Sequence, residues 1–210
     1  MKAVIFDLDG VLVFTDRFHY QAWKELADRL GIYFDETINN RLRGVSRMES
    51  LEIILERSAS TYSQEEKERF ASEKNERYRE LLAQMTPEDV TDEVRRTLAE
   101  LRRRGHRLAI GSSSKNARYI LERTALTEAF DAISDGTNIT RSKPDPEVFL
   151  KAAAFLGETP ENCAVVEDAP AGIEAAKAAG MMAIGIGEAA SCGKTDAPIT
   201  RFVELLDILP

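Results

Sequence analysis

Short apolar runs alternate with helical segments along most of this 210-residue chain, and this alternation limits the folds that it can adopt. Five runs have the length and composition of buried strands: residues 4–6, 108–110, 132–133, 163–166 and 182–184. Strands that each alternate with a helix form a parallel sheet with right-handed crossovers. The sequence therefore predicts an α/β fold with a doubly wound core of five parallel strands.

A long helical block separates the first predicted strand from the second. It contains no strand candidate, and two capping boxes, which begin at Ser46 and Ser63, each predict the start of a helix. Thr15 or Asp16 can cap the first helix of the block. The predicted domains are a core of residues 1–14 and 88–210 and an inserted helical cap of residues 15–87. Two chain crossings between them would allow the cap to close on the core as a lid.

Charge and composition exclude several classes of partner. The net charge of -8 argues against nucleic acid and against an anionic membrane surface, because both would be repelled. The longest run without a polar side chain, residues 178–187, is far too short to cross a membrane. Cys163 and Cys192 show no metal-like or redox spacing. We therefore expect a cytoplasmic protein with no nucleic-acid partner and no membrane partner.

Polar side chains follow four of the five predicted strands. They are Asp7 and Asp9 after the first strand, residues 112–116 after the second, Lys143 after the third, and Glu167 and Asp168 after the fourth. Each group alone has an ordinary structural explanation as a turn, a helix cap or a solvated side chain. Ligands of open parallel sheets bind at the carboxyl ends of the strands, so the four groups together predict a site at that edge.

The residue types at this edge point to phosphoryl transfer. Several carboxylates packed together need a cation, and hard oxygen ligands select Mg²⁺ or a similar metal. The hydroxyls and amides of residues 112–116 suit an anionic oxygen. A metal, a polar cradle and a fixed lysine together neutralise a phosphoryl group while it is transferred.

The same motifs resemble the four motifs of the haloacid dehalogenase superfamily, and the resemblance spans the whole chain. It implies a Rossmann-like, doubly wound parallel sheet in the order 5-4-1-2-3 with a helical cap inserted after the first strand. Asp7 is implied as the nucleophile that forms an aspartyl-phosphate, and Asp9 as the general acid and base. Ser112 and Lys143 would hold the phosphoryl oxygens. The implied magnesium ligands are Asp7, the backbone carbonyl of Asp9, Glu167 and Asp168.

Further residues are similar to those of the beta-phosphoglucomutase family within this superfamily. These are His19, Trp23, Gly44, Val45, Ser46, Arg47, Ser50 and Lys74 in the cap, and Ser114, Lys115 and Asn116 in the core. The resemblance implies that Arg47 grips the phosphate that is not transferred, through the paired hydrogen bonds that a guanidinium offers. Residues 114–116 would contact the same phosphate from the core.

The resemblance also gives the rest of the cap a role. Lys74 and His19 would line the sugar side and help to position Asp9, and Trp23 would form part of the cap wall. The alternative for Trp23 is a plain core side chain, and the alternative for His19 is an ordinary helix residue.

The leading hypothesis from the sequence is therefore a Mg²⁺-dependent mutase that interconverts beta-D-glucose 1-phosphate and beta-D-glucose 6-phosphate. The reaction would pass through beta-glucose 1,6-bisphosphate and an aspartyl-phosphate enzyme. The alternative is a phosphatase with the same core that hydrolyses a small sugar or polyol phosphate. A phosphosugar-binding protein without catalysis is disfavoured, because Asp7, Asp9 and Asp168 are all present. The expected partner is a small-molecule sugar phosphate, and the expected form is a monomer.

Overall fold

The structure, a computed structural model, describes residues 1–42 and 45–209. By its internal contacts the chain divides into two compact units. The core unit is Met1–Phe14 with Met85–Pro210, and the inserted unit is Thr15–Gln84. The sequence predicts the second boundary between residues 87 and 88, whereas residues 85–87 lie in the core unit.

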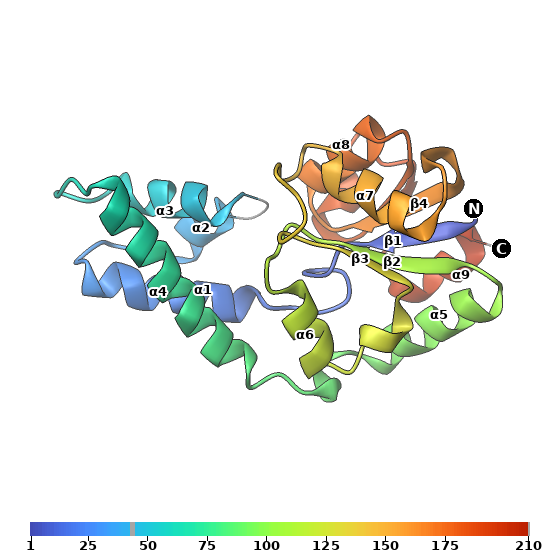
Figure 1. Ribbon diagram of the computed structural model, residues 1–210, viewed down its shortest axis with the longest axis horizontal. Coiled ribbons are helices and arrows are strands. Elements are labelled where there is room, and N and C mark those ends of the chain that lie inside the picture. The colour runs from blue at the N-terminus through green and yellow to red at the C-terminus, as the bar shows by residue number, and fades with distance from the viewer. Residues whose placement is uncertain (43–44, 210) are drawn as a thin grey trace. The chain divides into compact units, whose positions relative to one another are not determined.

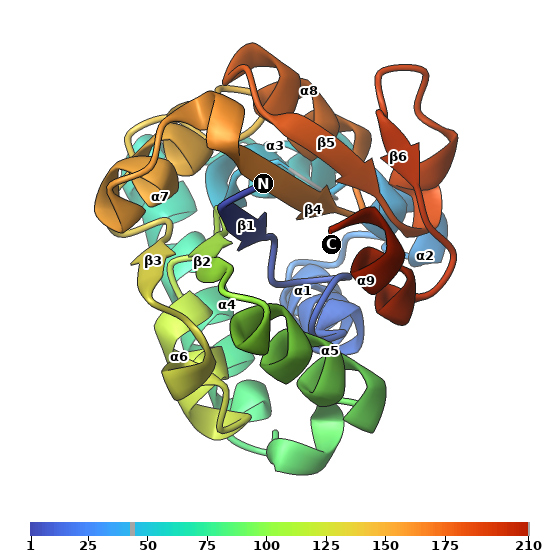
Figure 2. The ribbon, with the colours of Figure 1, turned by 90° about the vertical axis from the view of Figure 1, so that its right-hand side faces the viewer.

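In the described part of the core unit, one parallel sheet has six strands in the order β3-β2-β1-β4-β5-β6 (Figure 2). The strands are β1 (Ala3–Phe6), β2 (Arg107–Gly111), β3 (Ala132–Ser134), β4 (Cys163–Glu167), β5 (Met182–Gly185) and β6 (Ala197–Pro198). The predicted order of the first five strands is confirmed. The strand β6 escapes prediction because it has two residues, one of them proline, and no apolar run marks it.

Helices cover both faces of this sheet, as Figures 1 and 2 show. The helices α7 (Glu147–Leu156) and α8 (Pro170–Ala178) lie on one face, and α5 (Asp92–Arg103) and α9 (Leu205–Ile208) lie on the other. Alternate side chains of β1 serve the two faces: Ile5 belongs to the cluster beneath α7 and α8, and Phe6 contacts Phe130 and Phe202. Every residue of β1 is fully buried. The doubly wound α/β class is thus confirmed.

The inserted unit consists of helices around its own apolar cluster. They are α1 (Asp16–Arg29), α2 (Glu36–Asn40), α3 (Arg47–Leu55) and α4 (Gln64–Leu82). The predicted capping boxes at Ser46 and Ser63 are both present, at the starts of α3 and α4. The core cluster includes Trp23, Leu51 and Phe70. Among all the helices of the described residues, none combines the length and the apolar character that crossing a bilayer requires.

Thr15 occupies the predicted cap position, but its hydroxyl does not cap the helix. Thr15 is the N-cap residue of α1, but its side chain makes no capping hydrogen bond. The hydroxyl instead accepts a hydrogen bond from Tyr78 Oη at 3.0 Å, and both side chains are buried. A tertiary partner from α4 has therefore taken the acceptor that a local cap would use.

Candidate active site

Asp7 directly follows β1 and carries the first carboxylate of the carboxyl edge. The strand β1 lies between β2 and β4, and Phe6 is in register with Ile110 and Val166, so the three strands end within one residue of the same level. The side chain of Asp7 is buried, with 8% of the residue exposed. The central position of β1 therefore brings Asp7 to the ends of both neighbouring strands.

A buried lysine bridges Asp7 to a second buried acid. Lys143 Nζ lies 2.5 Å from Asp7 Oδ1 and 2.5 Å from Glu167 Oε1. The ammonium group also lies 4.8 Å from the centroid of the Phe149 ring, which belongs to α7. A lysine with one carboxylate on each side is fixed in place, because leaving a buried charge unpaired is costly.

Three carboxylates converge beside this lysine. One oxygen each from Asp7, Glu167 and Asp168 can be chosen so that all lie within 4.8 Å of one another. Two glycines make room for them. A Cβ on Gly10 would lie 2.0 Å from Asp168 Oδ2, and a Cβ on Gly172 would lie 1.9 Å from the carboxyl carbon of Glu167. Gly10 also has φ of +80°, which disfavours any other residue there.

The raised pKa values of Glu167 and Asp168 show that placing several negative charges in this buried site is unfavourable. Burial, together with the charges of the neighbouring Asp7 and Glu167, raises the pKa of Asp168 to about 8. Burial also raises the pKa of Glu167, against the attraction of Lys143. Burial alone would lower the pKa of Lys143, but Asp7 and Glu167 outweigh it and raise that pKa. Three close carboxylate oxygens fit a divalent cation such as Mg²⁺, which would relieve the repulsion between them.

Asp9 lies near enough to this group of acids for its charge to raise the pKa of Asp168. It is partly exposed and forms a β-bridge with Val13, in a tight turn closed by a hydrogen bond from Gly10 N to Val13 O at 2.7 Å. The carboxylate of Asp9 does not belong to the three-acid group. Its role as general acid and base therefore stays a prediction.

The loop after β2 is held by its own hydroxyls. Ser112 Oγ accepts a hydrogen bond from Ser114 N at 3.2 Å, and Ser114 Oγ accepts one from Asn116 N at 3.1 Å. The N-cap residue of α6 (Ala117–Arg123) is Asn116, so Ser114 is not the helix cap. Ser112 and Asn116 are buried, whereas Lys115 is exposed. The serines order the loop rather than begin the helix.

In the inserted unit, three predicted residues lie together. Lys74 Nζ is 2.9 Å from His19 Nδ1 and 4.6 Å from the centroid of the Trp23 ring. Tyr78 completes the group: its ring stacks on that of His19 with centroids 4.0 Å apart, and it lies 4.7 Å from Lys74 Nζ. Tyr78 is not among the predicted site residues, but it lies four residues after Lys74 in the same helix, and this spacing could have revealed its place beside Lys74.

These basic groups are partly removed from water. Desolvation lowers the pKa of His19 well below its usual range, and the charges of Lys74 and Arg47 lower it further. The imidazole is therefore neutral at pH 7, and its Nδ1 accepts a hydrogen bond from the ammonium group of Lys74. Arg47 Nη2 donates a hydrogen bond to Asn75 Oδ1 at 2.7 Å, and burial lowers the pKa of Arg47.

Comparison with known proteins identifies the family of this chain. A model of a hydrolase family, the haloacid dehalogenase-like hydrolases, matches residues 1–180. The chain belongs to the haloacid dehalogenase-like hydrolase family.

The curated relatives of this chain include proteins named as mutases and proteins named as phosphatases. The chain is 46% identical over 190 residues to a beta-phosphoglucomutase of Bacillus subtilis (strain 168), which covers 90% of this chain and 84% of the relative. It is 34% identical over 184 residues to a phosphorylated carbohydrates phosphatase of Thermotoga maritima, covering 86% and 82%. Among solved structures, a beta-phosphoglucomutase from Clostridium difficile matches with a TM-score of 0.90 and 38% identity, covering 98% of this chain and 93% of the other.

The remaining predicted site residues of the inserted unit differ in their burial and in their hydrogen bonds. Val45 is exposed, and Ser50 is buried in α3. Ser46 Oγ accepts a hydrogen bond from Glu49 N at 3.3 Å, so this hydroxyl serves the helix cap. Gly44 lies outside the described residues.

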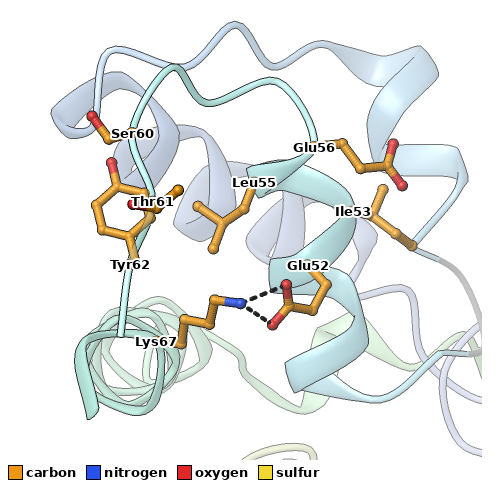
Figure 3. Close-up of a pocket in the computed structure, with 8 residues that line it drawn as sticks. All are labelled: Glu52, Ile53, Leu55, Glu56, Ser60, Thr61, Tyr62 and Lys67. Carbon is orange, nitrogen blue, oxygen red and sulfur yellow. Dashed lines mark hydrogen bonds and ion pairs between the residues drawn. The ribbon is translucent and has the colours of Figure 1, made fainter. Parts of the chain in front are cut away.

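A cavity of about 480 Å³ opens in the inserted unit at the end of α3 (Figure 3). Its lining consists of Glu52, Ile53, Leu55, Glu56, Ser60, Thr61, Tyr62 and Lys67. Figure 3 shows Lys67 Nζ between the two carboxylate oxygens of Glu52, at 2.8 and 2.9 Å. None of the predicted site residues lines this cavity, and the charges of Lys67 and Glu52 compensate each other.

Proposed function

We propose that the protein is a Mg²⁺-dependent mutase that interconverts beta-D-glucose 1-phosphate and beta-D-glucose 6-phosphate through beta-glucose 1,6-bisphosphate. The observation that carries this proposal is the 46% identity, over 90% of the chain, to a relative named beta-phosphoglucomutase. The cluster of Asp7, Lys143, Glu167 and Asp168 supports the class of chemistry, because it combines a carboxylate nucleophile with a fixed cation and a set of metal ligands.

In the proposed reaction, Asp7 attacks phosphorus and becomes an aspartyl-phosphate, and the bond to the sugar oxygen breaks. Lys143 holds the carboxylate of Asp7 in place and balances the charge of the phosphoryl oxygens, which Ser112 also binds. Asp9 gives a proton to the leaving sugar oxygen and later takes one from the attacking hydroxyl.

The proposed metal ligands are the side chains of Asp7, Glu167 and Asp168 and the backbone carbonyl of Asp9. When bound, Mg²⁺ supplies positive charge against the phosphoryl oxygens. A bound cation would offset the repulsion between the acids of the cluster. Asp168, whose pKa burial and its acidic neighbours raise to about 8 without metal, could then be ionised near neutral pH.

The proposed substrate carries a second phosphate that must be held while the first is transferred. Arg47 is proposed to bind it bidentately, with Ser114, Lys115 and Asn116 as further partners. His19 and Lys74 are proposed to bind the sugar side. A desolvated guanidinium and a buried ammonium suit an anionic ligand, because both bind anions more strongly away from water.

The second candidate function is hydrolysis of a small sugar or polyol phosphate with the same core. It is supported by the 34% identity to a phosphatase of phosphorylated carbohydrates, a lower identity than that to the mutase. The two candidates differ in the group that accepts the phosphoryl group from Asp7, which is a sugar hydroxyl in the mutase and water in the phosphatase. A monomeric, cytoplasmic enzyme is the form that we propose for either activity.

One product assay separates the candidates. Purified protein is mixed with beta-glucose 1-phosphate, Mg²⁺ and a trace of beta-glucose 1,6-bisphosphate, and both glucose 6-phosphate and free phosphate are measured over time. The mutase proposal requires glucose 6-phosphate as the main product. Free phosphate released in step with substrate loss, without glucose 6-phosphate, would replace it by the phosphatase.

A further inference from the structure

The turn after β3 lies directly against the loop that is proposed to bind the sugar phosphate. Ser112 N donates a hydrogen bond to Ser134 O at 3.1 Å, and Gly136 N donates one to Ser114 O at 3.1 Å. A Cβ on Gly136 would lie 2.4 Å from Ser113 O and 2.8 Å from Lys115 N. These are backbone atoms, so the loop would have to move to admit even a methyl group.

The turn is itself braced by a buried acid. Asp135 is fully buried, and its Oδ1 accepts hydrogen bonds from Thr137 N at 2.9 Å and Thr137 Oγ1 at 2.5 Å. Asn138 Oδ1 accepts hydrogen bonds from Ser134 Oγ at 3.2 Å and from Asp135 N at 3.3 Å. A turn held by its own side chains at this many points keeps one shape.

The same acid also reaches the helix behind the loop. Asp135 Oδ2 lies 3.4 Å from Nε of Arg118, a residue of α6, which begins where the loop ends. The turn after β3 therefore contacts residues 112–116 through backbone atoms, and it contacts the helix that follows them through the charge of Arg118. Burying a carboxylate is costly unless it is used for such contacts.

We propose that Asp135 and Gly136 are positioning residues that hold residues 114–116 in the form that binds the second phosphate of the substrate. Gly136 sets how closely the turn approaches the loop, and Asp135 keeps the turn rigid. Binding groups must be held to within about half an ångström to be effective. The identity of the ligand rests on the function proposed above, but the positioning itself does not.

The test compares Gly136→Ala with Gly193→Ala, a glycine that has open space around its Cβ position and no positive φ. In Gly136→Ala, we expect the KM for the sugar phosphate to rise roughly tenfold with kcat changed less than about twofold. Hydrolysis of p-nitrophenyl phosphate, which lacks a second phosphate, should change less than about twofold. Amide hydrogen exchange should speed up at residues 112–116 and stay unchanged in β1 and β4. Gly193→Ala should match the parent protein in every measurement.

Three results would overturn the proposal: unchanged exchange at residues 112–116, faster exchange with an unchanged KM, or equal losses with both substrates. If Gly136→Ala does not fold, Asp135→Asn replaces it, because the amide keeps the size of the carboxylate and weakens the hold on Arg118 and Thr137. A failure of the mutase proposal is recognised separately, by free phosphate as the product of the parent protein. The KM comparison is then made on that hydrolysis, and the exchange measurement needs no substrate.

Discussion

Among the described residues, each unit buries one lysine, and the two lysines have different surroundings. Lys143 in the core unit lies between the carboxylates of Asp7 and Glu167. Lys74 in the inserted unit contacts the imidazole of His19 and the rings of Trp23 and Tyr78. Anionic neighbours stabilise the first ammonium group electrostatically, whereas aromatic faces stabilise the second through their quadrupoles, which is a weaker effect.

The difference indicates a division of labour. The core edge gathers negative charge around Asp7, the proposed nucleophile, which suits a metal ion and a reaction at phosphorus. The inserted unit gathers Lys74 and Arg47 beside neutral hydrogen-bonding groups, His19 and Asn75, which suits the recognition of an anion. We therefore infer that substitutions in the cluster of acids around Lys143 remove chemistry and that those around Lys74 and Arg47 remove selectivity.

The largest effect is expected from Asp7→Asn compared with Arg47→Ala. Loss of the nucleophile should lower kcat by at least about a thousandfold with every substrate, because no aspartyl-phosphate can form. Loss of the guanidinium should raise the requirement for beta-glucose 1,6-bisphosphate roughly a hundredfold, while hydrolysis of p-nitrophenyl phosphate falls less than about threefold. Steady-state kinetics with both substrates measure the two effects.

Asp207→Asn, at an exposed carboxylate of α9, is the matched control and should retain full activity. If Arg47→Ala loses both activities equally, the guanidinium does not act as a clamp for the second phosphate. Substantial mutase activity in Asp7→Asn would contradict the proposed mechanism altogether.

The two lysines should also differ in what they contribute to stability. Lys143→Met leaves Asp7 and Glu167 buried without their cation, which should cost about 3–5 kcal/mol of the free energy of unfolding. Lys74→Met places a thioether among aromatic rings, where sulfur packs well, and should cost less than about 1.5 kcal/mol. Urea unfolding without Mg²⁺ measures both, and equal losses would refute the contrast.

These residues also show how far the sequence leads. The grouping of Asp7, Glu167 and Asp168 could be predicted, because parallel strands that end in polar residues deliver them to one edge. The burial of Asp135 could not, because an Asp–Gly pair looks like any exposed turn. The sequence predicts Thr15 or Asp16 as the cap of the first inserted helix, but the hydroxyl of Thr15 accepts a hydrogen bond from Tyr78, 63 positions along the chain. The sequence predicts a local motif where contacts between neighbouring residues decide the structure. It does not predict which distant residue will contact a given side chain.

Binding of Mg²⁺ to the acids of the core unit should add a further difference between the two units. At a concentration about a hundredfold above its Kd, Mg²⁺ should stabilise the parent protein by about 2.7 kcal/mol. Asp168→Asn should lose most of this gain. Without metal at about pH 9, the same variant should be more stable than the parent, because the raised pKa of Asp168 means that folding disfavours its ionised form. Thermal unfolding with Mg²⁺ and with a chelator measures both, and the Asp207→Asn control should behave as the parent does.

The smallest effect is a pH dependence from the inserted unit. The pKa of His19 in the folded protein lies well below 6.5, because desolvation, Lys74 and Arg47 all disfavour its protonated form. The unfolded chain therefore binds more protons below about pH 6.5, and the stability that this group contributes is lost as the pH falls from there through the folded pKa. His19→Asn keeps an acceptor for Lys74 and does not titrate. Between about pH 7.5 and 5.5, the parent should lose roughly 1 kcal/mol more of its free energy of unfolding than the variant. Urea unfolding at each pH measures this difference. If the free energies of unfolding of the parent and of His19→Asn change equally with pH, the basic groups of the inserted unit do not disfavour protonation of His19. The contrast with Lys143, which lies between acids, would then lose its electrostatic basis.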